Sequence, residues 1–290
     1  MRLHQGMSPM LVDEQVASFW RFVRLRQEAW LWKAAGGAKS EFPGDAVLRE
    51  GWFPNVYRAE DRGSRYAVRE LEGRETREVL WGAVAYRLLN RQATFEAFGR
   101  IPYRGDGQEW VEFIAARYAA RESVTSGRHL TPSRVMYLEA LRQAWSWWAV
   151  SWPERGEDMY WALRKLRGVG PFLAWQVYAD LVMMKRTRWN PDFALPGEGS
   201  AYAIKMLLGE RTAAEYSHPS HKPGVSQVGI ITRERPTVKE QKAMAWVVLA
   251  LRDMQGGYNF HRTKGQEMTV IDIEHALCEW QRWSVAWARR

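Results

Sequence analysis

Cysteine is almost absent from this chain of 290 residues, since Cys278 is the only one. One cysteine cannot form an internal disulfide or a zinc site of several thiolates, so a disulfide-stabilised secreted fold and a cysteine zinc module are excluded. Long hydrophobic runs are also missing. No segment reaches the ~20 apolar residues of a membrane-spanning helix, and residues 1–12 lack the apolar centre of a secretory signal. We therefore expect a protein of the cytoplasm with no membrane association.

Lysine is scarce, whereas arginine is abundant: the chain has 9 lysines and 33 arginines. The net charge of +9 is therefore carried mainly by guanidinium groups, which bind phosphates and carboxylates through two parallel hydrogen bonds. This balance indicates an anionic partner, of which nucleic acid is one example. Metal ligands are few. His218 and His221 stand three residues apart without cysteine or acidic neighbours, and we predict no metal site there.

Strand-like alternation is nearly absent, and only residues 228–232 have the pattern of a short strand. Helical periodicity predominates, and two segments begin with a capping-box pattern, Thr237 to Glu240 and Thr269 to Asp272. We predict loops over residues 40–54 and 218–236. The predicted fold is one all-α domain over residues 1–290, built as two helical lobes around a central cleft. The helical stripes lie in residues 16–35, 80–88, 110–114, 131–150, 238–254 and 270–280.

The most specific local pattern is a helical hairpin at about residues 158–184. A leucine-rich helix runs to Gly168, Val169 and Gly170 follow, and Pro171 starts a new helix. Glycines allow positive φ and the close approach of a phosphate, and a helix start offers N–H groups and a positive dipole end. We predict that Gly168, Val169, Gly170 and Phe172 contact DNA. The alternative is an ordinary hairpin in which the glycines only cap helices.

This hairpin resembles the helix-hairpin-helix of the DNA glycosylase superfamily of that name. Those enzymes carry an aspartate ahead of a helix that ends in Leu-Gly. Counting back eleven residues from Gly209 reaches Glu198, so a glutamate stands in the corresponding place. The lysine of the lyase-type members is replaced by Phe172. The resemblance therefore implies no strand-cleaving lyase chemistry and weakens the case for base excision.

A set of seven motifs, in the same order, is similar to a narrower group, the phage thymine-hypermodification family. This family is also known as α-glutamyl/putrescinyl-thymine pyrophosphorylase, and it includes amino acid:DNA transferases and the helical domain of 5-hydroxymethyluracil DNA kinases. The resemblance covers about residues 15–285. The motifs are FWRFVRLR at Phe19, NVYRAEDR at Asn55, YRLLNR at Tyr86, TF at Thr94, GVGPF at Gly168, PGEG at Pro196 and IEHALCEW at Ile273.

The resemblance implies a base-modifying reaction. A kinase would need a phosphate-binding loop of the pattern G-x-x-x-x-G-K-[ST], which these 290 residues lack. The transferase branch would replace the pyrophosphate of 5-pyrophosphoryloxymethyluracil in DNA with the amine of an amino acid or polyamine. It implies DNA with a modified thymine as partner, the amine as co-substrate, no other cofactor, and a 5-hydroxymethyluracil DNA kinase as functional partner in a phage-infected host. A divalent cation could replace arginines at the leaving group.

Such a transferase needs cations at the leaving pyrophosphate, and four arginines in the matching motifs are candidates. They are Arg58, Arg62, Arg87 and Arg91. Arg87 lies on the apolar face of its helix, where a charge needs a partner or a ligand. The alternative for Arg87 is a structural ion pair, with Glu60 or Asp61. The neighbouring Asn90 either bonds a uracil edge or caps the helix, and we favour the cap.

The attacking amine must also lose a proton, which requires a carboxylate as general base. Glu198 is the first candidate, and Asp192 and Glu274 are its rivals. Glu274 lies in the first turn of a helix, where an acid is favourable for electrostatic reasons alone. Two other functions stay open: a monofunctional glycosylase, and a DNA-binding module without chemistry.

Overall fold

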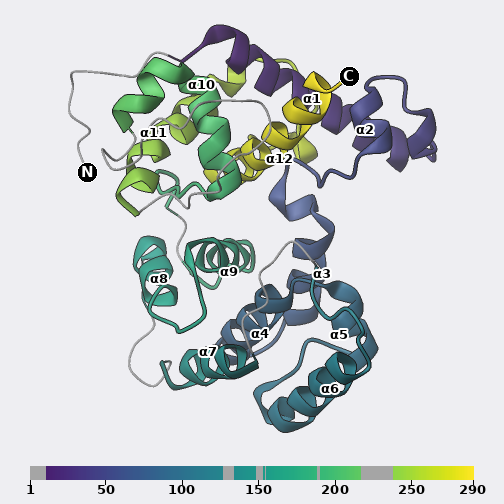
Figure 1. The fold of residues 1–290 in the computed structure, drawn as a ribbon, viewed down its shortest axis with the longest axis vertical. Coiled ribbons are helices and arrows are strands. Elements are labelled where there is room, and N and C mark those ends of the chain that lie inside the picture. The colour runs from purple at the N-terminus through teal and green to yellow at the C-terminus, as the bar shows by residue number, and fades with distance from the viewer. Residues whose placement is uncertain (1–10, 127–133, 148–152, 154, 188–189, 217–237) are drawn as a thin grey trace. The chain divides into compact units, whose positions relative to one another are not determined.

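The structure is a computed structural model that describes residues 11–126, 134–147, 153, 155–187, 190–216 and 238–290 (Figure 1). In these ranges helices are the only regular secondary structure, so the all-α prediction is confirmed. The chain divides into two compact units, Met1–Arg58 with Pro191–Arg290, and Ala59–Asn190. They correspond to the two predicted lobes, and the cleft remains a prediction. No described helix is both long and apolar enough to cross a bilayer.

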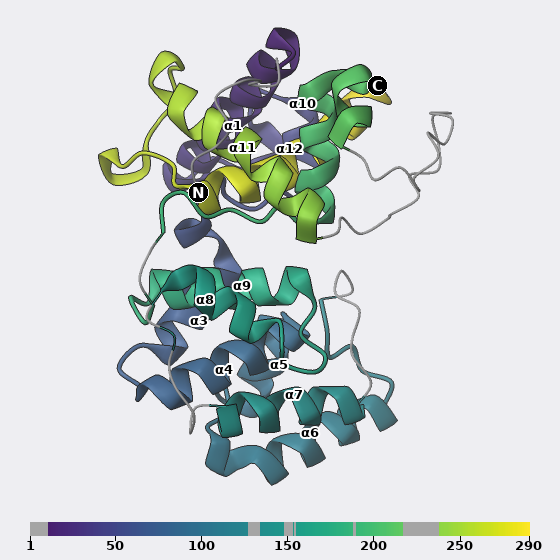
Figure 2. The same ribbon diagram turned by 90° about the vertical axis from the view of Figure 1, so that its left-hand side faces the viewer.

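The first unit is built around α12 (Val270–Ala288), which contacts α1 (Asp13–Ala34), α2 (Ala46–Glu50), α10 (Glu198–Tyr216) and α11 (Val238–Met254). Figure 2 shows α1, α10, α11 and α12 gathered in this unit. Aromatic rings join α12 to α1: Phe19 packs edge-on against Trp280, with 5.8 Å between centroids, and Phe22 packs against Trp283 at the same distance. These rings are buried, so they form the core that fixes the position of α12.

The start of α12 follows the predicted capping box. The Thr269 hydroxyl accepts from the Asp272 N–H, while the Asp272 carboxylate accepts from the Thr269 N–H. The prediction of a loop over residues 40–54 is wrong in part, because it contains a 3₁₀ turn (Lys39–Glu41) and α2. Asp45 caps α2 by accepting from the Leu48 N–H at 2.8 Å, and Leu48 is buried.

The second unit contains α3 (Arg62–Leu71), α4 (Thr76–Leu89), α5 (Gln92–Phe98), α6 (Gly107–Ala119), α7 (Arg134–Trp147), α8 (Gly156–Leu163) and α9 (Pro171–Met183). Its central helix is α4, which packs against α3, α7 and α9. Every residue of α4 from Val79 to Leu89 is buried. Arg87 is the one charged residue in this stretch, so its environment decides whether the core is stable.

Several predictions fall on residues outside the described ranges. They include the helix start at Thr131 and Pro132, the short strand at 228–232, the loop at 218–236 with His218 and His221, and the cap at Thr237. The helices that follow these caps are present as α7 and α11. The helix predicted to end at Gly209 is the first part of α10, since Gly209 has φ +70° and ψ +163° and interrupts the helical geometry.

Candidate functional site

The predicted hairpin forms in the second unit, between α8 and α9. Gly168 has φ +85°, a left-handed conformation that favours glycine, and the Val169 N–H donates to the Leu166 carbonyl at 3.0 Å. The Arg164 side chain stabilises the turn, because its Nη1 donates to the Val169 carbonyl at 2.9 Å. The following helix starts with Pro171 in its first turn, as expected.

Two details of the hairpin differ from the prediction. The α-helix ends at Leu163 and not at Gly168, because the next amides form tighter bonds, Lys165 to Ala162 and Leu166 to Leu163. Gly170 has φ −71° and ψ 176°, so it needs no left-handed conformation. A Cβ at Gly170 would meet no protein atom within 4 Å. The structure therefore leaves open space at Gly170, and DNA contact at this space stays a prediction.

Arg87 forms a buried ion pair with Asp180 of α9. Its Nε donates to Asp180 Oδ2 at 2.6 Å and its Nη2 to Oδ1 at 2.5 Å, and the two side chains are 2% and 0% exposed. Burial alone would lower the pKa of Arg87, but the charge and hydrogen bonds of Asp180 more than offset this and raise it. The ion pair anticipated for Arg87 exists, but its partner is Asp180 and not Glu60 or Asp61.

Two more side chains complete the bonding of the Arg87 guanidinium. Nη1 donates to Asn90 Oδ1 at 2.9 Å, and Nη2 donates to the Ser64 hydroxyl at 3.1 Å. Asn90 also ends α4 in a left-handed conformation with φ +49°, so it is the helix cap that we favoured. Because Ser64 lies in the first turn of α3, the network joins the start of α3 to the end of α4.

Arg62 and Arg91 flank this network. Arg62 is the first residue of α3, whose start is capped by Asp61 through a 3.1 Å bond from the Ser64 N–H. Arg91 follows Asn90 and precedes α5. Arg62 is exposed, Arg91 is half-buried, and neither forms an ion pair with the described residues. Of the three predicted site arginines in the second unit, Arg87 is neutralised by Asp180, and binding of an anionic ligand by Arg62 and Arg91 stays a prediction.

Arg58 belongs to the first unit, where it is buried against the first turns of α12. Its backbone N–H donates to Asp272 Oδ1 at 2.6 Å, and its Nη1 lies 3.4 Å from Nδ1 of His275. Burial raises the pKa of Asp272, although bonds from Thr269 and Arg58 act in the opposite direction. The structure joins Arg87 to Asn90 in the second unit, places Arg62 at the start of α3 and Arg91 directly after Asn90 in the same unit, and places Arg58 in the first.

The predicted carboxylates also lie in the first unit. Glu274 is buried, and its Oε1 accepts from the Ser200 hydroxyl at 2.6 Å and from the Gly197 N–H at 3.1 Å, so it ties α12 to the start of α10. Asp192 is exposed and pairs with Arg252 at 3.1 Å. Glu198 is the first residue of α10, and its side chain lies outside the described residues.

Gly199, which follows Glu198, has a packing reason. A Cβ at Gly199 would lie 2.4 Å from the sulfur of Cys278 on α12. The two helices thus approach each other too closely at this point for any side chain at residue 199. Gly199 and Cys278 belong to two of the seven motifs, so this contact joins the PGEG and IEHALCEW motifs in the first unit.

Sequence reasoning missed Asp180, Ser64 and Ser200. The signal for Asp180 was present, because it is the one charged residue in α9 and must therefore be paired when that helix is buried. Nothing local distinguished Ser64 or Ser200 from other serines. Among the described residues, no group of three or more histidine, cysteine, aspartate or glutamate side chains has a metal-binding arrangement.

Comparison with known proteins gives one family. The family model described as 5-hmdU DNA kinase, helical domain, matches residues 13–288. Neither a curated protein nor a solved structure matches the chain. The matched range contains both units and all seven motifs, so this chain belongs to the family of the 5-hmdU DNA kinase helical domain.

Proposed function

We propose that this protein modifies thymine bases in phage DNA, as a transferase that exchanges the pyrophosphate of 5-pyrophosphoryloxymethyluracil for an amine. The amine nitrogen would attack the exocyclic methylene carbon and form a C–N bond. The C–O bond would break, with its electron pair leaving on the pyrophosphate, and the nitrogen would lose a proton to a base. The family match carries the proposal, because its description names a DNA kinase whose product chemistry provides such a leaving group.

The described geometry supports a site for the leaving group in the second unit. Among the described residues, neither Arg62 nor Arg91 forms an ion pair with an acid, so both guanidinium groups could donate to the charge that develops on a departing pyrophosphate. The base must leave the stack for its methylene carbon to be reached, and a DNA contact at the hairpin would hold the strand during this step. We propose Arg62 and Arg91 as pyrophosphate ligands and assign Arg87 to holding Ser64 and Asn90 in position.

The proton acceptor is proposed to be Glu198. Its rivals are less suitable: Glu274 already accepts two bonds that fasten α10, and Asp192 is paired with Arg252 in solvent. The co-substrate is an amino acid or polyamine, and a kinase of the same pathway would supply the pyrophosphorylated base. The proposal implies action in the cytoplasm of the infected host.

The test is a reaction with DNA that carries pyrophosphorylated 5-hydroxymethyluracil and a mixture of amino acids and polyamines. The DNA is digested, and the nucleosides are weighed by mass spectrometry. An amine-bearing thymidine is expected with the parent chain, and a strongly reduced yield with Arg62→Gln combined with Arg91→Gln. Arg77→Gln, at an exposed arginine of α4, is the matched control and should leave the yield unchanged. No amine-bearing product with any amine would refute the transferase.

A second candidate is a DNA-binding module without chemistry of its own. It is favoured by the neutralisation of Arg87 by Asp180 and by the description of the matched family as one domain of a kinase. This candidate predicts salt-sensitive DNA binding, no product, and stimulation of a separate hydroxymethyluracil kinase. A glycosylase would instead leave alkali-labile sites in the modified DNA, which the same reaction mixtures would reveal.

A further inference from the structure

Two tryptophan rings of the first unit are strongly exposed. Trp52 and Trp287 expose 55% and 51% of their surface, whereas Trp20, Trp280 and Trp283 of the same unit are buried and its other described tryptophans are half-buried. An exposed indole leaves a large apolar face in water, and such faces are the platforms on which nucleic-acid bases stack. Two of them in one unit therefore call for a ligand with flat apolar faces.

Arginines hold both tryptophans in place. The Nη2 of Arg282 donates to the Trp52 carbonyl at 3.2 Å, and the same guanidinium lies 5.2 Å from the centroid of the Phe53 ring. The guanidinium of Arg21 lies 5.8 Å from the centroid of the Trp287 ring. The backbone at Trp52 is thus held while its ring is exposed, so stacking of a base would order the side chain of Trp52 but not its backbone.

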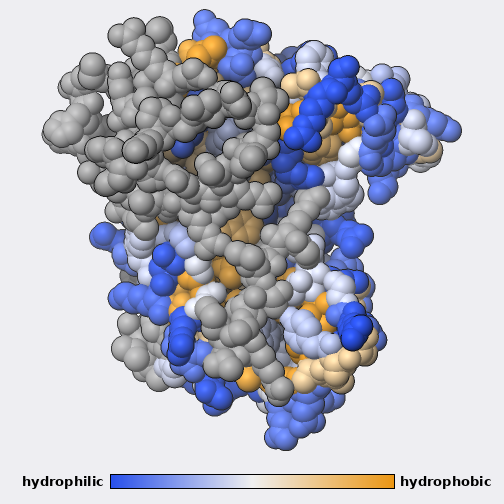
Figure 3. Space-filling view, viewed as in Figure 1, coloured by the Kyte–Doolittle hydropathy of each residue, from blue (hydrophilic) through white to orange (hydrophobic). Residues whose placement is uncertain are grey.

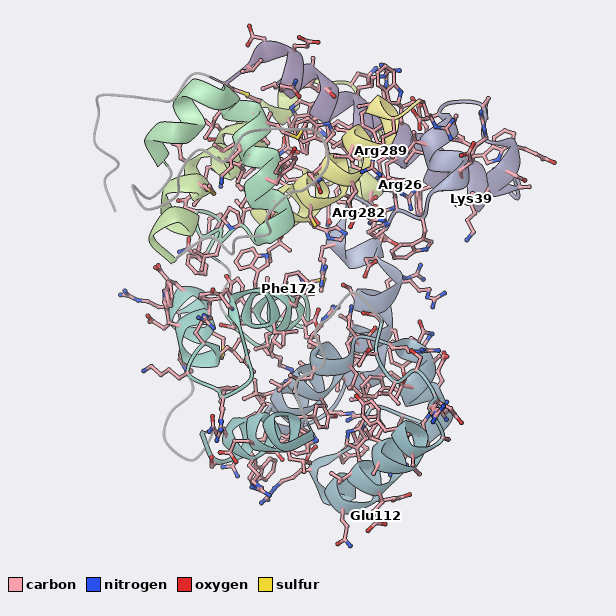
Figure 4. The ribbon with its side chains drawn as sticks, viewed as in Figure 1. Arg26, Lys39, Glu112, Phe172, Arg282 and Arg289 are labelled. Carbon is pink, nitrogen blue, oxygen red and sulfur yellow. The ribbon has the colours of Figure 1, made fainter. Side chains whose placement is uncertain are left out.

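These residues form one region of the first unit. Trp287 lies 6.3 Å from Trp283, the residue after Arg282 on α12, and Arg26 donates from Nε to the carbonyls of Phe53 and Pro54. Figure 4 shows the labelled Arg26, Arg282 and Arg289 in the same part of this unit. We call this region the arginine–tryptophan surface. It comprises Arg21, Arg26, Trp52, Arg282, Trp287, Arg289 and Arg290.

The arginine–tryptophan surface has an excess of positive charge. Its five arginines face two glutamates, Glu279 paired with Arg282 and Glu50 paired with Arg290. Arg21 and Arg289 are exposed and form no ion pair with the described residues. In the view of Figure 3, hydrophilic (blue) residues border a hydrophobic (orange) area on the coloured part of this unit. The combination of stacking faces and unneutralised guanidinium groups matches the chemistry of bases joined by phosphates.

We propose that the arginine–tryptophan surface binds single-stranded DNA, with bases stacked on Trp52 and Trp287 and phosphates beside Arg21 and Arg289. A duplex presents phosphates but keeps its base faces inside the stack, so two exposed indoles favour an unpaired strand. The proposal of a single-strand site is argued from contacts within the first unit and does not depend on the proposed transferase function. Only the choice of DNA over RNA rests on the function proposed above.

The test measures binding of the full chain to a labelled oligothymidine of about 20 nucleotides by fluorescence anisotropy, beside a duplex and an oligouridine of the same length. Trp52→Ala combined with Trp287→Ala should weaken binding to the single strand by about tenfold or more. Tyr118→Ala, at an exposed ring of α6 in the second unit, is the control and should bind like the parent chain. Activity is not measured, so failure of the transferase proposal would leave this result unaffected.

Salt dependence separates phosphate contacts from stacking. Arg21→Gln and Arg289→Gln should each reduce the slope of log affinity against log salt by about 0.7, whereas the tryptophan variants should leave the slope unchanged. Arg142→Gln, at an exposed arginine of α7, is the matched control. Unchanged single-strand affinity of the double tryptophan variant would overturn the proposal, as would an equal loss of its duplex affinity. Tighter binding of oligouridine would overturn the assignment to DNA.

Discussion

Arg87 and Asp180 form an ion pair with both side chains removed from solvent, and the two hydrogen bonds between them measure 2.6 and 2.5 Å. The pair joins α4, the central helix of the second unit, to α9, the second helix of the hairpin. The position of the hairpin relative to α4 therefore depends on a charge–charge contact inside an apolar core. Arg87 lies in the YRLLNR motif and the GVGPF motif begins α9, so the pair connects the helices of two motifs.

Removal of the acid should destabilise the chain strongly. Asp180→Asn leaves the charge of Arg87 buried without a counter-charge, which costs about 3–5 kcal/mol in comparable sites. Urea denaturation followed by circular dichroism would measure the loss. Asp192→Asn is the matched control, because Asp192 is exposed beside Arg252 and a surface pair contributes about 1 kcal/mol or less. Equal losses in the two variants would show that Arg87 finds another partner.

Gly170 allows a test of the hairpin that does not disturb the fold. Gly170→Ala places a methyl group in open space with an ordinary backbone conformation, so the free energy of unfolding should stay within about 0.5 kcal/mol of the parent value. If a phosphate approaches the main chain here, the methyl group should weaken duplex DNA binding several-fold. Anisotropy with a labelled duplex measures this effect.

Two comparisons make the result of this substitution interpretable. Gly105→Ala also places its Cβ in open space within the second unit, and it should change neither stability nor DNA affinity. Gly168→Ala should instead destabilise the chain, by about 1 kcal/mol or more, because Gly168 has φ +85°. An unchanged affinity for Gly170→Ala would favour the ordinary hairpin in which the glycines only cap helices.

The sequence predicted the helical fold and the hairpin well because both depend on local chemistry. The capping box at Thr269 and the proline after Gly170 specify helix starts from residues that are near each other in the chain. The loop prediction over residues 40–54 failed in part because α2 is only five residues long, too short for a visible periodicity.

The site was harder to predict because its contacts join distant parts of the chain. Arg87 was recognised as a buried charge, but its partner lies 93 residues further on, and nearby acids gave a simpler interpretation. Arg58 and Arg62 were grouped because both stand in the NVYRAEDR motif, yet the boundary between the two units falls directly after Arg58. A buried charge can be identified from periodicity, whereas the identity of its partner requires the tertiary structure.

Glu274 and Glu198 can be separated by a substitution that preserves shape. In Glu274→Gln the amide oxygen can still accept from Ser200 and Gly197, so we expect a stability loss of about 1 kcal/mol and an unchanged yield of modified nucleoside. Glu198→Gln should abolish the product without a comparable stability loss. Product mass spectrometry beside urea denaturation measures both effects. Loss of product in Glu274→Gln alone would move the role of general base to Glu274.

Buried tyrosines predict destabilisation at alkaline pH. Burial, with a further contribution from the charge of Asp272, raises the pKa of Tyr57 to about 12, and burial likewise raises the pKa of Tyr160 and of Tyr178 to about 12. The pKa of a tyrosine in the unfolded chain is about 10. Between about pH 10 and 12 the folded chain therefore binds more protons than the unfolded chain. The free energy of unfolding is therefore at its full value below this window and falls as pH rises through it.

Tyr57→Phe should make this decline less steep, because it removes one of the titrating hydroxyls. Below about pH 9 the variant should differ from the parent chain only by a constant. That constant is the lost bond from the Tyr57 hydroxyl to the Gln266 carbonyl, which is 2.8 Å long and contributes about 1 kcal/mol. Urea denaturation at several pH values, with tyrosinate absorbance followed in parallel, measures both quantities. Identical slopes for the two chains would mean that Tyr57 ionises in the folded protein at the same pH as in the unfolded chain.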